Sequence, residues 1–386
     1  MPGSGFNRRT LLAGLAAAGG ATIMPSRLAF ASPLATDKRF VFIIQRGAAD
    51  GLSTLAPVGD PQFAEIRGQL AEEFSDVPRI GTDFALHPDL PLLSELFQQE
   101  QALFLNAIAS PYRDRSHFDA QNVLETGGTR AFEHEDGWLN RIINLLPEGT
   151  RAMAVGSSIP AALRGPIEVS NYGSSVLPDA DEDLMRRVAK LYGEDEQLSG
   201  IWRNALEARD MAMGAEARGN NFGATGELAA NLLSGPNGAR IAMIETGGWD
   251  THVNQQLRLG YQFRGLNDLL VALRDGLGGH WANTLVLIAT EFGRTAAING
   301  TRGTDHGTAS LAMLLGGAVN GGRVITDWPG LKSSQLLEGR DLKPTMSLGA
   351  AIAGAMGEHF GIDPILAMST AFPGHGGRPT EGLIRA

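Results

Sequence analysis

The sequence predicts an α/β fold in which helices cover both faces of a mostly parallel central sheet. Short apolar runs recur along the chain, and segments with helical periodicity lie between them. The runs lack strict alternation of polar and apolar residues, which is typical of strands that are buried on both faces. With 386 residues, of which 43% are hydrophobic, the chain is long enough to bury such a core.

Five apolar runs are expected to form strands of this sheet. They are FVFIIQ (40–45), ALFLNAI (102–108), RIAMIET (240–246), NTLVLIAT (283–290) and LAMLLGG (311–317). Two of the segments between them are expected to be helices. Residues 88–99 place several leucines on one side, and residues 253–277 repeat apolar residues at steps of three and four. Strands that alternate with helices in this way indicate a largely parallel sheet.

The middle of the chain, residues 128–235, has a different composition. It is rich in Gly, Arg and acidic residues, with helical stretches at 181–193 and 201–217 and a weak strand at 152–156. We interpret this segment as an elaboration packed over the sheet of a single domain that covers residues 32–386.

The first 31 residues have the pattern of a bacterial twin-arginine signal peptide. Arg8 and Arg9 precede a mild apolar stretch, and AFA (Ala29–Ala31) follows it as a small-residue cleavage pattern. The stretch is too short and too rich in Gly and Ala to span a bilayer comfortably. We therefore expect the twin-arginine translocase as a partner during export and a periplasmic or secreted protein with no stable membrane span after cleavage. An ordinary secretory signal or an uncleaved anchor is the alternative.

The composition excludes several classes of site and partner. The chain has no Cys, which removes disulfides, thiolate nucleophiles and zinc–sulfur sites. Its formal net charge of −10 argues against nucleic acid as a partner. The negative charge does not exclude an anionic small substrate that metal ions hold locally.

Acidic residues and histidines follow the predicted strands at the points where these end. The residues are Asp50, Ser116, His117, Asp250, His252 and Glu291, with Asp305 and His306 in the loop 290–310. In open α/β sheets, ligands bind outside the carboxyl ends of the strands. The sequence therefore predicts a functional site at this edge of the sheet.

Carboxylates and imidazoles without thiolates suit a divalent metal ion such as Zn²⁺ or Mn²⁺. Asp250 and His252 lie two residues apart, so on an extended segment they point to the same side and can bind one ion. His306 would complete that set. Asp50 and Glu291 would serve a second ion or orient the ligands of the first. For any single acid at a strand end, a helix N-cap or a surface ion pair is the alternative role.

Ser116 precedes a predicted helix start, where it would be either an N-cap or a nucleophile beside the backbone N–H groups of the helix. Arg115 and Arg294 are candidate clamps for phosphate or sulfate oxygens, and pairing with carboxylates of the site is their alternative role. His117 would be a further ligand or a structural hydrogen-bond donor.

The motifs RGAADGL, RSHFDAQ, GGWDTH, TEFGRT and GTDHGTASLAMLLGG occur in this order along the chain. In these motifs the sequence resembles a family of exported bacterial proteins, domain of unknown function 1501. That family is similar in turn to the alkaline phosphatase and sulfatase superfamily, whose α/β sandwich holds two metal ions beside a Ser, Thr or formylglycine nucleophile. The resemblance implies a three-layer alkaline-phosphatase-like sandwich.

The resemblance also implies roles for individual residues. Asp50 matches the first metal-binding Asp and Ser116 the nucleophile, while Asp250, His252 and His306 match one metal site. Glu291 falls where the superfamily has the Asp of an Asp-His pair. Phe292 replaces the His of that pair, and Asp250 and His252 are two residues apart where phosphatases usually have four. The second site thus loses a ligand unless His117 or Asp305 substitutes, so one ion (Zn²⁺, Mn²⁺, Mg²⁺ or Ca²⁺) is expected rather than two.

The function expected from these residues is that of an exported metal-dependent hydrolase or transferase. Its substrate would be a phosphate or sulfate ester, either a small molecule or a saccharide. The alternative is a non-catalytic periplasmic binding or assembly protein that retains the fold. Turnover that depends on both Ser116 and His306 would distinguish the two functions.

Overall fold

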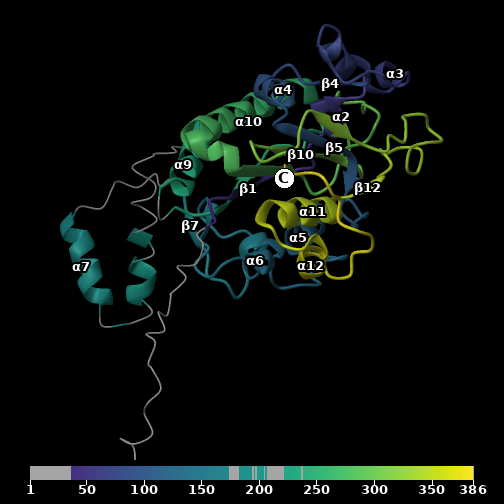
Figure 1. Ribbon diagram of the computed structural model, residues 1–386. Helices are drawn as coiled ribbons and strands as arrows, with labels where there is room; N and C mark the ends of the chain where they lie inside the picture. Colours follow the sequence, from purple (N-terminus) through teal and green to yellow (C-terminus); the bar gives the residue numbers. More distant parts are fainter. Residues whose placement is uncertain are drawn as a thin grey trace, which may run out of the picture. The chain divides into compact units, whose positions relative to one another are not determined.

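The computed structural model describes residues 36–173, 182–193, 195, 198–203, 205–206, 221–235 and 238–385, and Figure 1 shows them as a ribbon. The signal peptide expected over residues 1–31 lies outside the described residues, as does most of the helix expected over 201–217. Residues Ala35–Ala386 form one compact unit.

Nine strands of the described residues form the central sheet, in the order β11-β5-β10-β9-β1-β8-β6-β7, with β12 paired to β5. Their bounds are β1 (Arg39–Gln45), β5 (Ala102–Ala109), β6 (Ala152–Val155), β7 (Ser170–Tyr172), β8 (Ile241–Thr246), β9 (Thr284–Ala289), β10 (Ser310–Leu315), β11 (Arg323–Ile325) and β12 (Met346–Ser347). All pairings are parallel except those of β10, which runs antiparallel to both β5 and β9. The predicted α/β fold with a mostly parallel sheet is confirmed.

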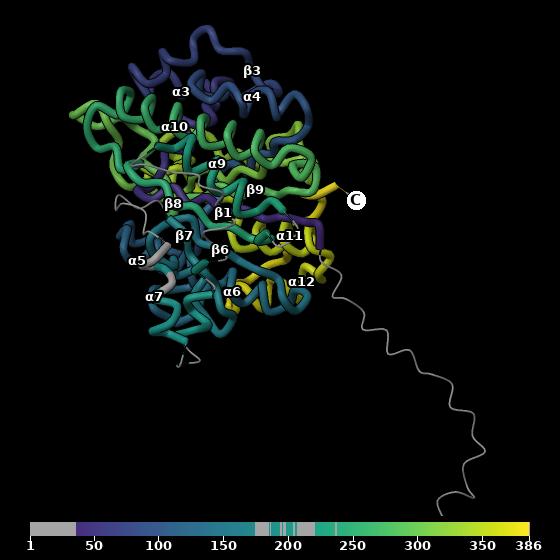
Figure 2. The backbone as a smooth tube through the Cα atoms, turned by 90° about the vertical axis from the view of Figure 1, so that its left-hand side faces the viewer, coloured from purple at the N-terminus to yellow at the C-terminus, as the bar shows by residue number. Residues whose placement is uncertain are grey.

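Helices pack against both faces of this sheet, and Figures 1 and 2 show the two helical layers on opposite sides of it. The first layer contains α4 (Pro91–Gln98), α9 (Phe222–Leu233) and α10 (Gln255–Leu277). The second contains α5 (His117–Thr126), α6 (Trp138–Ile143), α11 (Leu348–Phe360) and α12 (Pro364–Ala371). Helix α7 (Glu182–Tyr192) agrees with the helix expected over 181–193.

The side chains of β1 explain why the core has two halves. Val41 and Ile43 point to the first helical layer, whereas Phe40, Phe42 and Ile44 point to the second. Successive side chains of a strand point to opposite faces, so an unbroken apolar run fills both layers. In the second layer, the rings of Phe42 and Trp138 meet edge to face at 5.4 Å between their centroids.

A smaller sheet contains β2 (Leu55–Ala56), β4 (Phe84–Leu86) and β3 (Arg79–Ile80), in this order. In the sequence, the short helix α2 (Gly51–Thr54) precedes this sheet, and α3 (Phe63–Arg67) lies near it in Figure 1. The middle segment, predicted as an elaboration over the sheet, also supplies main elements. Strands β6 and β7 extend the edge of the central sheet, α6 joins the second helical layer, and α9 packs against α10 in the first.

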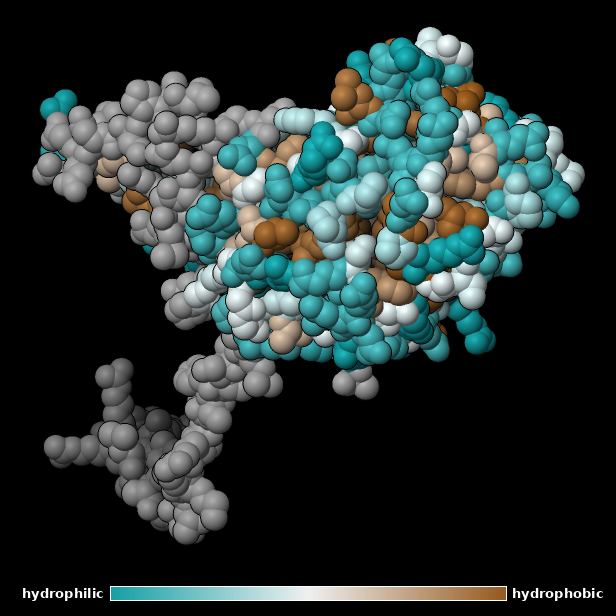
Figure 3. Space-filling view, turned by 90° about the horizontal axis from the view of Figure 1, so that it is seen from above, coloured by the Kyte–Doolittle hydropathy of each residue, from teal (hydrophilic) through white to brown (hydrophobic). Residues whose placement is uncertain are grey.

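The exposed surface carries apolar side chains in separate places. On the face shown in Figure 3, hydrophobic patches are divided by hydrophilic residues. Within the described part of the chain, no helix has both the length and the apolar character that a membrane crossing requires.

The sheet topology sets the position of the site. The carboxyl ends of β5, β9, β1 and β8 lie at one edge of the sheet because these strands run in the same direction. Strand β10 runs the other way, so it begins where the neighbouring β9 ends. The loop between β9 and β10, which carries Asp305 and His306, therefore stays at the edge where the loops after β1, β5 and β8 emerge.

Candidate metal centre

Three imidazole rings and one carboxylate converge at this edge of the sheet. The Nε2 atom of His306 lies 2.9 Å from Nε2 of His117 and 3.0 Å from Nε2 of His252. The carboxylate of Asp250 has one oxygen 3.0 Å from Nε2 of His252 and 3.4 Å from Nε2 of His306. Its other oxygen is 3.5 Å from Nε2 of His117. His117, Asp250 and His306 offer one ligand atom each within 4.8 Å of one another.

Each imidazole has its other ring nitrogen, Nδ1, held by an oxygen atom. His117 Nδ1 is 2.7 Å from Oε1 of Glu291, and His252 Nδ1 is 3.0 Å from Oδ1 of Asp305. His306 Nδ1 is 3.0 Å from the backbone carbonyl of Arg115. An ionised carboxylate or a carbonyl only accepts hydrogen bonds, so these contacts assign the proton to Nδ1. Each neutral ring then directs its Nε2 lone pair towards the common point.

Three lone pairs that face each other at about hydrogen-bond distance repel unless a positive charge lies between them. A proton or a divalent cation supplies that charge, and the nitrogen and oxygen donors present are those that zinc and similar ions take in proteins. Carboxylates and carbonyls behind the rings are the usual partners of metal-binding histidines, because they fix the tautomer and the ring orientation. The residues present therefore fit a metal ion.

Asp250 is held from behind by Arg294. The Nη1 atom of Arg294 donates to Oδ1 of Asp250 at 2.5 Å, and its Nε and Nη2 donate to the hydroxyl and the carbonyl of Thr304. Burial acts to raise the pKa of Asp250, but the Arg294 guanidinium outweighs it and holds this pKa below its usual value. The Arg294 side chain is 0% exposed and all three nitrogens are engaged. It supports Asp250, and the role of an anion clamp suggested by the sequence does not fit this position.

Glu291 is buried behind His117. Its Oε1 accepts hydrogen bonds from His117, from the backbone N–H of Gly47 at 2.8 Å and from Gln121 at 3.1 Å. Burial acts to raise the pKa of Glu291, but these donors together hold it below its usual value. A Cβ atom on Gly47 would lie 2.6 Å from the backbone nitrogen of Asp250, so only glycine lets the β1 loop approach this closely. Of the two roles left open for Glu291, the geometry matches the orientation of a ligand.

Hydrogen bonds, burial and neighbouring charge shift the pKa values of His117, His306 and Asp305. The hydrogen bond from His117 to Glu291 is the main cause that raises the pKa of His117. Burial, followed by the nearby charge of His117, lowers the pKa of His306. The hydrogen bond with His252 lowers the pKa of Asp305, so that carboxylate stays ionised and also supports a ring.

Phe292 forms an apolar wall of the centre. Its ring stacks on His117 with 4.9 Å between centroids and lies 5.3 Å from the ring of His306, and the residue is 4% exposed. The aromatic side chain thus takes the place of the ligand that the resemblance would put here. It restricts the movement of two rings and excludes water from one side of them.

Asp50 lies in a buried network that does not include the three histidines. Its Oδ1 accepts from the N–H of Leu52, as an N-cap of α2, and its Oδ2 accepts from Ser53, Arg67 and Gln255. Both Asp50 and Arg67 are at most 1% exposed. The carboxylate oxygens are committed to these donors, so the predicted role of Asp50 as a metal ligand is replaced by its alternatives, a cap and an ion pair.

Asp50→Asn is therefore expected to destabilise the fold without removing a metal ion. The change leaves the buried Arg67 charge without its counter-charge, which typically costs about 3–5 kcal/mol. Urea unfolding measures this loss, and the solvent-accessible pair of Asp89 with Arg264 gives the control, since Asp89→Asn should cost at most about 1 kcal/mol. An Asp50→Asn variant with normal stability but without its metal ion would instead show that Asp50 is a metal ligand.

Arg115 and Ser116 lie in the loop that precedes α5. This loop is tied to the centre by the ring of His117 and by the Arg115 carbonyl, which accepts from His306. Ser116 occupies the N-cap position of α5, but its hydroxyl makes no capping hydrogen bond. Arg115 has a φ of 60°, a left-handed conformation that non-glycine residues adopt rarely and often at functional sites. Its guanidinium donates to Asp341 at 2.8 Å and to Glu338 at 2.6 Å, so it too pairs with carboxylates.

Three residues of the surroundings were not predicted. Gln121 donates to Glu291 and accepts from Arg46 at 3.0 Å, and it lies in the motif RSHFDAQ, where its spacing from His117 places both on one side of α5. Asp341 accepts from Arg115 and from the Thr308 hydroxyl at 2.8 Å, but no motif or strand end marks it in the sequence. Arg113 donates to the carbonyls of Ser110 and Tyr112 and has no carboxylate partner among the described residues.

Comparison with solved structures finds proteins of several bacteria. An alkaline phosphatase from the Antarctic bacterium TAB5 has 13% sequence identity and a TM-score of 0.35, with 72% of this chain and 90% of that chain covered. The C-terminal periplasmic domain of EcEptC from Escherichia coli has 9% identity and a TM-score of 0.34, with 73% of each chain covered. The lipoteichoic acid synthase LtaP from Listeria monocytogenes has 10% identity and a TM-score of 0.34, with 73% of this chain and 66% of that chain covered. Scores this low do not carry a functional argument.

No curated protein matches the sequence. The sequence profile of the family described as "Protein of unknown function (DUF1501)" matches residues 109–365, which is most of the chain and includes Ser116, His117 and the loops that carry Asp250, His252 and His306. The chain therefore belongs to the DUF1501 family.

Proposed function

We propose that this protein is a metal-dependent hydrolase or transferase that acts on phosphate or sulfate esters. The observation that carries the proposal is the convergence of three Nε2 lone pairs and the Asp250 carboxylate, with an oxygen atom behind each ring. The side chains of Asp250 and His252 are 42% and 40% exposed, so the centre is open to a ligand from solvent. An open position is what distinguishes a catalytic metal site from a closed structural one.

A divalent cation held by these four groups would polarise an ester oxygen and stabilise the negative charge that develops on it. Three imidazoles with one carboxylate favour Zn²⁺ or Mn²⁺ over Mg²⁺ and Ca²⁺, which prefer oxygen ligands. One ion fits better than two, because Asp50 is enclosed by Arg67, Ser53 and Gln255, while Glu291 and Asp305 already bind the Nδ1 atoms of His117 and His252.

The residues of the loop before α5 would bind and attack the ester. The Ser116 hydroxyl is free of capping, and the first-turn N–H groups of α5, which no side chain caps, are suited to bind the oxygens of a phosphoryl or sulfuryl group. Ser116 directly precedes His117, so this helix end is adjacent to the metal centre. Arg113, which lacks a carboxylate partner among the described residues, is a better candidate for an anion clamp than Arg115 or Arg294.

One observation favours the second candidate, a binding or assembly protein with a structural ion. Both arginines predicted as clamps, Arg115 and Arg294, are paired with carboxylates, so neither is free to hold a transferred group. In that case the centre would bind a metal ion, yet no ester would turn over.

The test begins with metal-free protein prepared by chelation and reloaded with Zn²⁺, Mn²⁺, Mg²⁺ or Ca²⁺ in turn. Each form is then assayed with nitrophenyl phosphate, bis-nitrophenyl phosphate and nitrophenyl sulfate. We expect turnover of at least one ester with Zn²⁺ or Mn²⁺ and none after chelation. A bound ion without turnover on any ester would favour the binding protein.

We also propose that the chain reaches the periplasm or the exterior through the twin-arginine pathway. The double substitution Arg8→Lys and Arg9→Lys is expected to leave the precursor in the cytoplasm, because that pathway reads the paired arginines. Cell fractionation and immunoblotting measure the distribution. Normal export of the double variant would show that another route is used.

A further inference from the structure

A cavity of about 350 Å³ lies between the end of β8 and the helices α9 and α10, and the start of the loop that carries Asp250 forms part of its lining. Its lining residues are Phe222, Thr225, Glu245, Thr246, Gly247, Gly248, Tyr261, Gln262 and Leu269. Gly248 lies two residues before Asp250, so their Cα atoms are at most about 7 Å apart. The size falls within the range of roughly 300–1,000 Å³ found for small-molecule sites.

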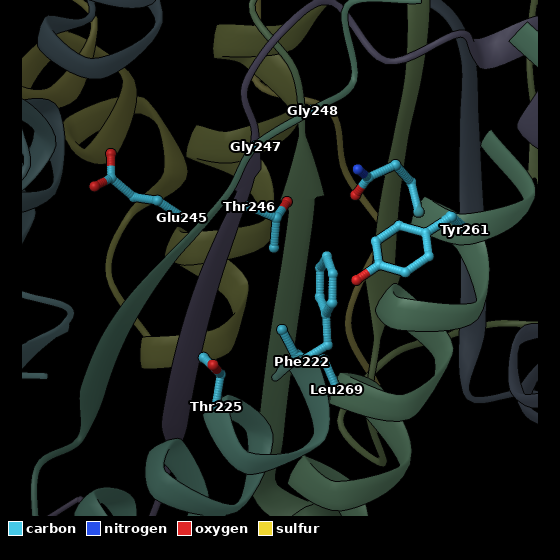
Figure 4. Close-up of a pocket in the computed structure, with 9 residues that line it drawn as sticks. Phe222, Thr225, Glu245, Thr246, Gly247, Gly248, Tyr261 and Leu269 are labelled. Carbon is cyan, nitrogen blue, oxygen red and sulfur yellow. The ribbon is translucent and has the colours of Figure 1, made fainter. Parts of the chain in front are cut away.

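Two aromatic rings form the apolar part of the cavity. Figure 4 shows Phe222 and Tyr261 on the same side of the strand that ends at Thr246, while the Glu245 carboxylate points away from them. Tyr261 is 57% exposed, although a ring of this size is usually more buried. A Cβ atom on Gly265 of α10 would lie 2.4 Å from the Phe222 ring, so the glycine lets this ring pack directly on the helix.

The polar part of the cavity contains a buried acceptor without a donor. Oε1 of Gln262 is buried and has no hydrogen-bond partner among the described residues. Leaving such a group unpaired typically costs about 1–3 kcal/mol, and a ligand hydroxyl or N–H would satisfy it. No bond from the backbone N–H of Gly247 or Gly248 to another described residue is present, and both glycines are exposed at the cavity.

We infer that this cavity is a subsite for a saccharide, the part of the substrate that carries the ester. A pyranose ring has apolar C–H faces, which stack on aromatic rings, and a rim of hydroxyls, which need acceptors and donors. Phe222 and Tyr261 match the faces, and Gln262 with the two glycine amides matches the rim. An acyl chain would need an aliphatic lining, and Leu269 is the single aliphatic side chain of leucine, isoleucine or valine type that lines the cavity. The assignment of this saccharide to the ester substrate rests on the proposed function.

Direct binding tests the subsite without any turnover. The probes are unesterified trisaccharides of glucose, of galactose and of N-acetylglucosamine, measured by calorimetry and by saturation-transfer NMR on the full protein, with and without Zn²⁺. We expect at least one of them to bind in both conditions. Tyr261→Ala and Phe222→Ala should each weaken its affinity by about tenfold or more, as truncation of an aromatic anchor does.

Leu257→Ala is the matched control, because Leu257 lies on the same helix, is 76% exposed and does not line the cavity. The Leu257→Ala variant should bind the saccharide with the affinity of the wild type. Gln262→Leu keeps the volume of the side chain and should also weaken binding, while circular dichroism and thermal unfolding confirm that each variant is folded.

The outcomes separate the subsite from the ester chemistry. Saccharide binding that the aromatic variants weaken would support the subsite even if no ester turns over, in which case the proposed function would fail alone. Ester turnover without binding of any trisaccharide would overturn the subsite and leave the proposed function standing. Binding that is equal in the wild type, Tyr261→Ala and Phe222→Ala, or binding of an alkyl glycoside through its chain alone, would also overturn it.

Discussion

His306→Ala is expected to leave the purified protein without its metal ion. The Nε2 atom of His306 is the common neighbour of the other two imidazoles, at 2.9 and 3.0 Å, and of the Asp250 carboxylate at 3.4 Å. Loss of a group behind a ligand typically lowers metal affinity by about 10- to 100-fold, so loss of this central ligand should lower it by more than about 100-fold. Elemental analysis after gel filtration and competition with a zinc chelator measure both the stoichiometry and the affinity.

Two variants make this result specific. His280→Ala removes a histidine outside the cluster and should retain the ion at the wild-type affinity. Glu291→Gln removes the carboxylate that holds Nδ1 of His117 and should weaken binding by about 10- to 100-fold without abolishing it. A protein that binds its ion equally well with Ala at position 306 would disprove the assignment of this centre.

Ser116→Ala is expected to abolish ester turnover while metal binding and stability remain. If the Ser116 hydroxyl is the nucleophile, its removal should lower kcat by about a thousandfold or more, since no other group takes over the covalent step. The hydroxyl makes no capping bond at α5, so the free energy of unfolding should change by less than about 0.5 kcal/mol. Steady-state kinetics, elemental analysis and urea unfolding of the same preparation test the three statements together.

Ser347 provides the matched control, because its hydroxyl does cap a helix. It accepts from the N–H of Ala350 at the start of α11, in the loop-to-helix position that Ser116 occupies at α5. Ser347→Ala should therefore cost about 1 kcal/mol of stability and leave turnover unchanged. Wild-type turnover in Ser116→Ala would show that the nucleophile is another group, such as water.

The strands could be predicted from the sequence, because a strand that is buried on both faces appears as a continuous apolar run. FVFIIQ became β1 and NTLVLIAT became β9, each within a residue or two of the expected bounds. The site was accessible in outline for a related reason. Parallel strands present their carboxyl ends at one edge, so acidic residues and histidines that follow several strands must gather there.

The individual roles were not accessible in the same way, because they depend on what each side chain meets. Asp50 and Asp250 both follow a strand, but Arg67 and Gln255 enclose the first, whereas the second faces three imidazoles. An arginine such as Arg294 can bind an anion, and the sequence alone leaves that role open. Its burial beside Thr304 and Asp250 shows that its N–H donors already bind these two residues.

The sequence by itself determined the α/β layers, the edge of the sheet at which the site lies and the residue types available there. It does so because hydrophobic patterning and residue chemistry are local properties of the chain. The tertiary structure decided which of these residues meet. The antiparallel direction of β10 returns His306 to the edge where β9 ends, and the close approach of the β1 loop at Gly47 brings a backbone N–H to Glu291. Contacts between residues so far apart in the chain depend on strand order and direction, which no local pattern encodes.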